Sequence, residues 1–256
     1  MASLHKAFRR RAIRLASRLE RRAAALQGRG WGAGTHDAEV RTASRLLGRS
    51  PSLVVDVGGN VGDYTAATLA MSPTAEVHVF EPAAVNVEVL RERFSAHDRV
   101  NVVPKAVAGE PGTASLFANA QGSGLASLSR RRLDHFGIDF TYEETVALTR
   151  FEDYWREELG GRLIDVCKLD IEGHELAALS GFGDALDNVD VLQFEFGGAN
   201  IDTRTYFQDF WYRLTSHHFE LFRVTPLGPH RLRRYDEFDE CFRTTNYIAR
   251  AKRRVR

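Results

Sequence analysis

The feature that most constrains the fold is an apolar run, Leu53–Val57, that leads directly into a glycine-rich turn at residues 58–62. A helical pattern follows, and a second apolar run ends at Phe80-Glu81-Pro82. Strand, glycine turn, helix and strand in this order form the opening βαβ unit of a nucleotide-binding α/β domain. Glycines allow the backbone to approach a ligand closely, and a carboxylate after the second strand can accept hydrogen bonds from a ribose diol.

The spacing of the glycines separates classes of nucleotide cofactor. A dinucleotide fingerprint has the form Gly-x-Gly-x-x-Gly, and counted from Gly58 its later glycines are replaced by Asn60 and Asp63. The pattern that fits is Asp-x-Gly-x-x-x-Gly, formed by Asp56, Gly58 and Gly62. This spacing argues against a nicotinamide-dependent oxidoreductase. The alternative is a turn that only joins a strand to a helix.

Strand and helix patterns alternate along most of the chain. Strands are expected at 53–57, 76–80, 100–104, 113–117, 163–169, 189–196, 218–224 and 241–249, and helices at 36–47, 64–71, 86–94, 150–159, 175–179 and 206–216. Such alternation requires an α/β fold with a mostly parallel sheet and helices on both faces. The last two strands have no evident helix between them, which predicts an antiparallel finish.

Ionisable residues are concentrated directly after the apolar run at 163–169. Four of them fall within six residues, and they are Asp170, Glu172, His174 and Glu175. Ligands in open α/β sheets bind beyond the carboxyl ends of the strands, so this cluster is a candidate site. Asp170, Glu172 and Glu195 could also offer oxygen ligands to Mg²⁺.

Three motifs together resemble those of the FkbM-type methyltransferase family. They are residues 56–65, Phe80-Glu81-Pro82 with Asn86 beyond it, and Lys168-Leu169-Asp170-Ile171-Glu172-Gly173-His174-Glu175, and the similarity covers roughly residues 52–226. Gly59 stands where the family usually has alanine. The resemblance implies a Rossmann-like class I methyltransferase fold with a seven-stranded, mostly parallel sheet, an antiparallel last strand and helices on both faces.

The resemblance also implies a cofactor, an activity and a set of site residues. The cofactor would be S-adenosylmethionine, bound by Asp56, Gly58, Gly59, Asn60, Gly62, Tyr64, Thr65, Glu81, Pro82, Lys105 and Ala106. The activity would be O-methylation of a hydroxyl on a sugar, a glycolipid or a polyketide-type small molecule. Asp170, Glu172 and His174 are the candidates to orient that hydroxyl and take its proton, and the ordinary pKa of His174 lies closest to neutrality. Alternatively, His174 only begins a helix.

A long irregular segment is expected at residues 118–141. Loops of this length in compact domains are usually functional or disordered, so we interpret it as a lid or an acceptor-binding loop. The run Arg130-Arg131-Arg132 could grip a phosphate or carboxylate of the acceptor, or could form an ordinary solvated turn.

The N-terminus has a different character from the rest of the chain. Residues 1–27 contain eight basic residues and one acid, with apolar residues at helical spacing, which predicts a basic amphipathic helix. Such a helix could contact a membrane surface, direct the chain to an organelle or pack on the domain. A glycine-rich linker is expected to end at residue 34, and a methyltransferase domain to occupy residues 35–256. A non-enzymatic interaction module is the main alternative function.

Composition limits the remaining classes. The formal net charge is only +1, so no overall field favours nucleic acid as a partner. The chain has two cysteines, Cys167 and Cys241, which are expected to be buried thiols in a reducing cytoplasm. No apolar run is long enough to span a bilayer, so membrane contact would be peripheral.

Overall fold

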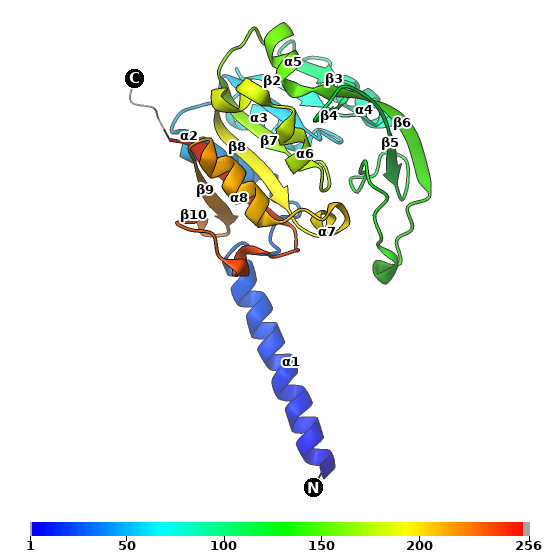
Figure 1. Ribbon diagram of the computed structural model, residues 1–256, viewed down its shortest axis with the longest axis vertical. Helices are drawn as coiled ribbons and strands as arrows, with labels where there is room; N and C mark the ends of the chain where they lie inside the picture. The colour runs from blue at the N-terminus through cyan, green and yellow to red at the C-terminus, as the bar shows by residue number, and fades with distance from the viewer. Residues whose placement is uncertain (1, 253–256) are drawn as a thin grey trace.

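The computed structural model describes residues 2–252, and side chains from residue 9 onward. An eight-stranded sheet in the order β10-β9-β11-β8-β7-β1-β2-β3 forms its centre (Figure 1). The strands are β1 (Leu53–Val57), β2 (Glu76–Phe80), β3 (Val100–Val103), β7 (Ile164–Leu169), β8 (Val189–Phe196), β9 (Phe219–Thr225), β10 (Gly228–Arg231) and β11 (Thr245–Ala251). The neighbouring strands β3, β2, β1, β7 and β8 are parallel, whereas β11 is antiparallel to both β8 and β9. The predicted antiparallel last strand is therefore confirmed.

Helices cover both faces of this sheet. One core contains residues of α2 (His36–Leu47), α3 (Asp63–Met71) and α4 (Ala84–Arg93), and the other contains residues of α5 (Phe151–Glu157), α6 (Glu175–Ser180) and α8 (Phe207–Ser216). Side chains of a strand alternate between faces, so Val54 and Val166 enter the first core while Val55 and Cys167 enter the second. Burial on both faces confirms the predicted Rossmann-like α/β class.

The predicted number of strands in this sheet was one too few. The additional strand is β10, which pairs antiparallel with β9 after a two-residue turn. It has four residues and is largely exposed, so no apolar alternation marks it in the sequence.

A second, three-stranded sheet has the order β4-β6-β5. Its strands are β4 (Ala106–Ala108), β5 (Gly112–Ala118) and β6 (Tyr142–Arg150). The sequence predicted β5 but not β6, because β6 buries only Val146 and Thr149 and most of its other side chains are exposed or half-buried. Between β5 and β6 the chain is largely irregular, as expected, apart from the short 3-10 helix η1 (Asp134–Phe136) and an isolated bridge between Phe117 and Ser127.

The order of the strands places a crevice at the end of β1. The chain passes from β1 to β2 and β3 on one side and then returns to β7 on the other, which makes β1 and β7 the switch point of the sheet. Gly58 follows β1 with φ +85°, and a Cβ atom there would lie 1.9 Å from the carbonyl oxygen of Asp170. Glycine at this position therefore lets the two strand ends approach each other.

α1 (Ala2–Leu26) extends away from the domain (Figure 1). The possibility that it packs along the domain is wrong for residues 9–23, nearly all of which are exposed. The segment expected to be a linker instead lies against the sheet, because the backbone N–H of Gly30 donates to Thr245 Oγ1 at 3.0 Å. Nowhere in residues 2–252 is a helix both long and apolar enough to cross a membrane.

Candidate cofactor and acceptor site

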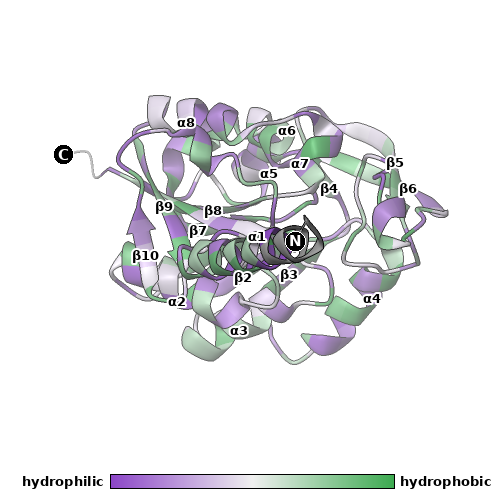
Figure 2. Ribbon diagram, turned by 90° about the horizontal axis from the view of Figure 1, so that it is seen from below, coloured by the Kyte–Doolittle hydropathy of each residue, from purple (hydrophilic) through white to green (hydrophobic). Residues whose placement is uncertain are grey.

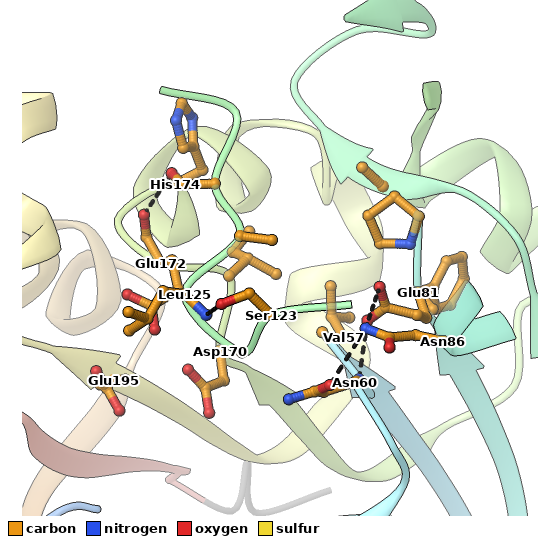
Figure 3. Close-up of a pocket in the computed structure, with 18 of the residues that line it drawn as sticks. Val57, Asn60, Glu81, Asn86, Ser123, Leu125, Asp170, Glu172, His174 and Glu195 are labelled. Atoms are coloured by element: carbon orange, nitrogen blue, oxygen red, sulfur yellow. Dashed lines mark hydrogen bonds between the residues drawn. The ribbon is translucent and has the colours of Figure 1, made fainter. Parts of the chain in front are cut away.

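A cavity of about 290 Å³ lies where β1, β2 and β7 end (Figure 3). Ligands of open α/β sheets bind at this position, beside the switch point. Nine of the predicted site residues line the cavity, namely Gly58, Asn60, Glu81, Pro82, Lys105, Ala106, Asp170, Glu172 and His174. Predicted residues that do not line it are Asp56, Gly59, Gly62, Tyr64 and Thr65.

Glu81 connects the end of β2 to the turn after β1. Its Oε2 accepts a hydrogen bond from the backbone N–H of Asn60 at 2.8 Å, and its Oε1 accepts from the backbone N–H of Ala83 at 2.9 Å and from Asn86 Nδ2 at 3.4 Å. Burial raises the pKa of Glu81 against the opposing effect of these donors. A carboxylate oxygen has about two acceptor positions, so Oε2 can accept a second hydrogen bond from a ligand.

Asp56, Thr65 and Tyr64 support the cavity from behind. Asp56 Oδ2 accepts from the hydroxyl of Thr65 at 2.7 Å, and Asp56 Oδ1 lies 3.6 Å from Lys168 Nζ. The buried Lys168 Nζ also lies 5.0 Å from the centre of the Tyr64 ring and 3.2 Å from Asp170 Oδ2. None of the three residues lines the cavity itself. Thr65 bonds Asp56, both Asp56 and Tyr64 lie beside Lys168, and Lys168 pairs with Asp170, which does line the cavity.

The other two predicted glycines serve close packing of the turn. A Cβ atom on Gly59 would lie 2.1 Å from Val79 Cγ1, and one on Gly62, where φ is +88°, would lie 2.5 Å from Phe94 Cε2. Val79 therefore occupies the space that an alanine at position 59 would need.

Acidic side chains gather on the opposite side of the cavity from Glu81. Asp170, Glu172 and Glu195 line this side together with His174, and Asp170 lies between the other acids and Asn60 (Figure 3). Burial raises the pKa of Glu172 to about 8, and burial with the nearby acids raises the pKa of Glu195 well above its ordinary value. Burial lowers the pKa of His174. At neutral pH burial therefore favours the protonated form of Glu172 and Glu195 and the uncharged imidazole of His174.

Each arginine of the run at 130–132 has a carboxylate partner within the chain. The pairs are Arg130 with Glu143 at 3.1 Å, Arg131 with Glu172 at 2.5 Å and with Asp202 at 3.3 Å, and Arg132 with Asp134 at 3.3 Å. Only the pair of Arg131 and Glu172 involves a cavity residue. The run thus anchors the loop to the cavity wall through Arg131.

The irregular loop after β5 forms part of the cavity wall. Ser123, Gly124 and Ser127 line the cavity, and a Cβ atom on Gly124 would lie 2.9 Å from Asn60 Nδ2. The hydroxyl of Ser127 donates to the carbonyl oxygen of Glu172 at 2.8 Å. The loop therefore contacts both sides of the cavity, in keeping with its predicted position over the site.

Sequence reasoning missed several residues of the wall, including His36 and Thr244. His36 Nδ1 lies 3.9 Å from Glu39, whose carboxylate also accepts from Gln193 Nε2 at 2.7 Å and from Asn246 Nδ2 at 2.8 Å. These residues come from α2, β8 and β11, and no local motif marks them as neighbours. The one available signal was an acid at position 39 on the apolar face of a predicted helix.

A magnesium site was one of the open expectations. Within the part of the chain that the structure describes, no three histidine, cysteine, aspartate or glutamate side chains are arranged to hold a metal ion. The prediction of Mg²⁺ at Asp170, Glu172 and Glu195 therefore has no structural support.

Comparisons with known proteins identify relatives of this chain. Curated proteins similar to the chain include Methyltransferase 1 of Beauveria bassiana, 25% identical over 157 residues, covering 54% of this chain and 63% of that protein. Methyltransferase sdnD of Sordaria araneosa is 29% identical over 157 residues, covering 52% of this chain and 61% of that protein. The third, 2-O-methyltransferase NoeI of Sinorhizobium fredii, is 24% identical over 166 residues, covering 61% of this chain and 68% of that protein.

The first two of these matches span less than two thirds of the relatives' length. Among solved structures, a putative O-methyltransferase from Klebsiella pneumoniae has a TM-score of 0.49 at 9% identity, covering 86% of this chain and 81% of that chain, a likeness too distant to carry an argument. The family model described as Methyltransferase FkbM domain matches residues 56–221. Since this match covers more than half of the sequence, the chain belongs to the FkbM methyltransferase family.

Proposed function

We propose that this protein is an S-adenosylmethionine-dependent O-methyltransferase that acts on a hydroxyl of a sugar, a glycolipid or a polyketide-type small molecule. The observation that carries the proposal is the position of Asp170. Its carboxylate lies between two parts of the same cavity (Figure 3). One part is the glycine turn with Glu81, and the other is formed by the side chains of Glu172, His174 and Glu195. Two substrates held on either side would meet at this residue.

The Glu81 side of the cavity fits the proposed cofactor. Glu81 Oε2 keeps an acceptor position for a ribose hydroxyl, and Gly58 lines the cavity without a side chain that would fill it. Phe80, Val107 and Leu116 supply apolar surface for an adenine ring. When bound, S-adenosylmethionine supplies a methyl group on a sulfonium centre that is already strongly electrophilic.

The acidic side of the cavity suits a hydroxylated acceptor. Carboxyl groups accept hydrogen bonds from hydroxyls, and Glu172 and Glu195 with raised pKa values can also donate them. The formal net charge of only +1 provides no overall attraction for a polyanion, so we expect no nucleic acid as substrate. The name of the relative NoeI, a 2-O-methyltransferase, supports oxygen as the methylated atom.

The remaining task of the protein is to align the acceptor oxygen and remove one proton. Asp170 is our candidate for the proton acceptor, because Lys168 Nζ at 3.2 Å holds its carboxylate in place. Burial lowers the pKa of His174 and so makes its imidazole a weaker proton acceptor, and Ser129 Oγ lies 3.0 Å from its Nε2. We therefore assign His174 and Glu172 to orientation of the acceptor.

Calorimetric titration with S-adenosylmethionine, S-adenosylhomocysteine and NAD⁺ tests the cofactor assignment. We expect both sulfur compounds to bind and NAD⁺ not to bind. Transfer of a labelled methyl group to a panel of sugars, glycolipids and hydroxylated polyketides would then identify the acceptor class. A folded protein that binds neither sulfur compound would refute the proposal and favour an interaction module.

A further inference from the structure

Several short elements cluster on the side of the domain from which α1 projects. In Figure 1, η1, α7 (Ala199–Thr203) and η3 (Glu237–Asp239) all lie toward this lower side of the molecule. The cavity is near the same side, because its wall includes Gly32 and Gly34, which closely follow α1 in the chain. Figure 2 looks along α1 onto this face.

Each of these short elements exposes a large apolar side chain. The exposed fractions are 71% for Phe136 on η1, 60% for Ile201 on α7 and 78% for Phe238 on η3. The three residues come from separate regions of the sequence and share no motif. Single exposed apolar residues are common on protein surfaces, so these three gain weight only because they lie on the same face as α1.

α1 adds an amphipathic helix to this face. Leu15, Leu19 and Leu26 fall on one side of the helix at spacings of four and seven residues, and all three are more than half exposed. The neighbouring side is basic, and between residues 9 and 26 the charged residues are Arg9, Arg10, Arg11, Arg14, Arg18, Arg21, Arg22 and the single acid Glu20.

A free helix of this kind lacks its main source of stability. Amphipathic helices in proteins are stabilised mostly by packing of their apolar side, and here Leu15, Leu19 and Leu26 are each more than half exposed. The partner must therefore accept both the apolar side chains and an excess of positive charge.

We propose that α1 and the tips of η1, α7 and η3 bind an anionic lipid surface, with the cavity held near that surface. A second copy of the chain would bring the same arginines together, which repel one another, so self-association fits poorly. A single acidic protein would need a complementary shape for apolar residues on separate tips. Lipid accepts scattered apolar side chains without such a shape, while anionic headgroups match the arginines.

Lipid binding would require α1 to turn where it leaves the domain, so that its apolar side lies in the interface. Such a turn would fall where the helix ends at Leu26, and it would break the hydrogen bond that the backbone N–H of Arg29 donates to the carbonyl oxygen of Ala24. If the proposed methyl transfer is correct, an acceptor carried in the membrane would then reach the cavity directly. This last consequence rests on the proposed function, whereas lipid binding itself does not.

Sedimentation of the full-length protein with vesicles tests the proposal without cofactor or acceptor, so it can fail independently of methyl transfer. We expect binding to vesicles of phosphatidylcholine with phosphatidylglycerol, little binding to phosphatidylcholine alone, and weaker binding as the salt concentration rises. Absence of binding to the anionic vesicles would overturn the proposal.

Matched substitutions identify the surface that binds. Leu15→Glu combined with Leu19→Glu should weaken binding to anionic vesicles by about tenfold or more, and Phe136→Ser should weaken it less. Leu163→Glu is the control. Leu163 is 49% exposed, but it precedes β7 and so lies at the end of the strands opposite the cavity. Unfolding curves would verify that each variant is folded.

Two further results would contradict the proposal. One is vesicle binding by the Leu15→Glu, Leu19→Glu variant that equals that of the wild type. The other is a wild-type dimer, seen by light scattering, that this variant converts to a monomer, since a second copy would then cover α1.

Discussion

The two sides of the cavity are built in different ways. The Glu81 side consists of one continuous βαβ unit, in which backbone N–H groups of Asn60 and Ala83 bind the carboxylate. The acidic side is assembled from segments far apart in the chain, including the loop after β5, the end of β7 and Glu195 on β8. Under the proposed function, the cofactor side is encoded locally, whereas the acceptor side depends on distant segments.

The charge environments also differ. Burial raises the pKa of Glu81, whose two oxygens both have hydrogen-bond donors, and it also raises the pKa values of Glu172, Glu175 and Glu195, where the nearby Asp170 adds to the effect. Substitutions that affect one side and spare the other therefore test whether the two sides act separately.

Replacing Asp170 with asparagine should have the largest effect. If Asp170 takes the proton of the acceptor hydroxyl, methyl transfer should slow by about 10²- to 10⁴-fold, with little change in the affinity for S-adenosylhomocysteine. Single-turnover kinetics and calorimetry measure the two quantities. Asp187→Asn, at an exposed site paired with His217, is the control. Full activity in Asp170→Asn would move the proton acceptor elsewhere.

Replacing Glu81 with alanine should have the converse effect. Loss of the charged acceptor should weaken binding of S-adenosylhomocysteine by about 10- to 100-fold, since hydrogen bonds to charged groups contribute about 1.5–3 kcal/mol. The KM for the acceptor should change little once cofactor is saturating. Glu88→Ala on the exposed side of α4 is the matched control. Unchanged affinity in a folded Glu81→Ala protein would remove the ribose assignment.

Gly59→Ala tests whether the turn on the Glu81 side is determined by packing. The new methyl group would meet Val79 Cγ1, so the free energy of unfolding should fall by about 1–3 kcal/mol. Denaturant titration measures this loss. The loss should be smaller when Val79 is already alanine, and equal losses in both backgrounds would show that Val79 is not the cause.

Glu175→Gln should have the smallest effect, on the pH dependence of stability. Burial raises the pKa of Glu175 to about 7 in the folded protein, so between about pH 4.5 and 7 the folded state holds a proton that the unfolded state has released. Wild-type stability should therefore fall as the pH rises through this range. The glutamine variant lacks this contribution, and its melting temperature should fall less. If the melting temperatures of the wild type and of Glu175→Gln fall equally between about pH 4.5 and 7, the assignment is contradicted.

Much of the fold could be predicted because its signals are local. The strands β1, β2, β7 and β8 are buried on both faces and appear as apolar runs, and the turn at Gly58 carries its own motif. Strand β6 could not be recognised, because it is half-buried and its stability comes from pairing with β4 and β5. Similarly, the pairing of Arg131 with Glu172 depends on where a long loop folds back.

Local patterns along the chain were enough to predict the α/β class, the switch-point turn, the Glu81 side of the cavity and the basic character of α1. Periodic burial and glycine geometry are properties of neighbouring residues, so they can be read along the chain. The folded structure was needed to place Asp56 and Thr65 behind the wall, to add His36 and Thr244 to the cavity and to expose Phe136 and Phe238 on the face that bears α1. Those relations depend on long-range packing, which brings together residues that no local pattern connects.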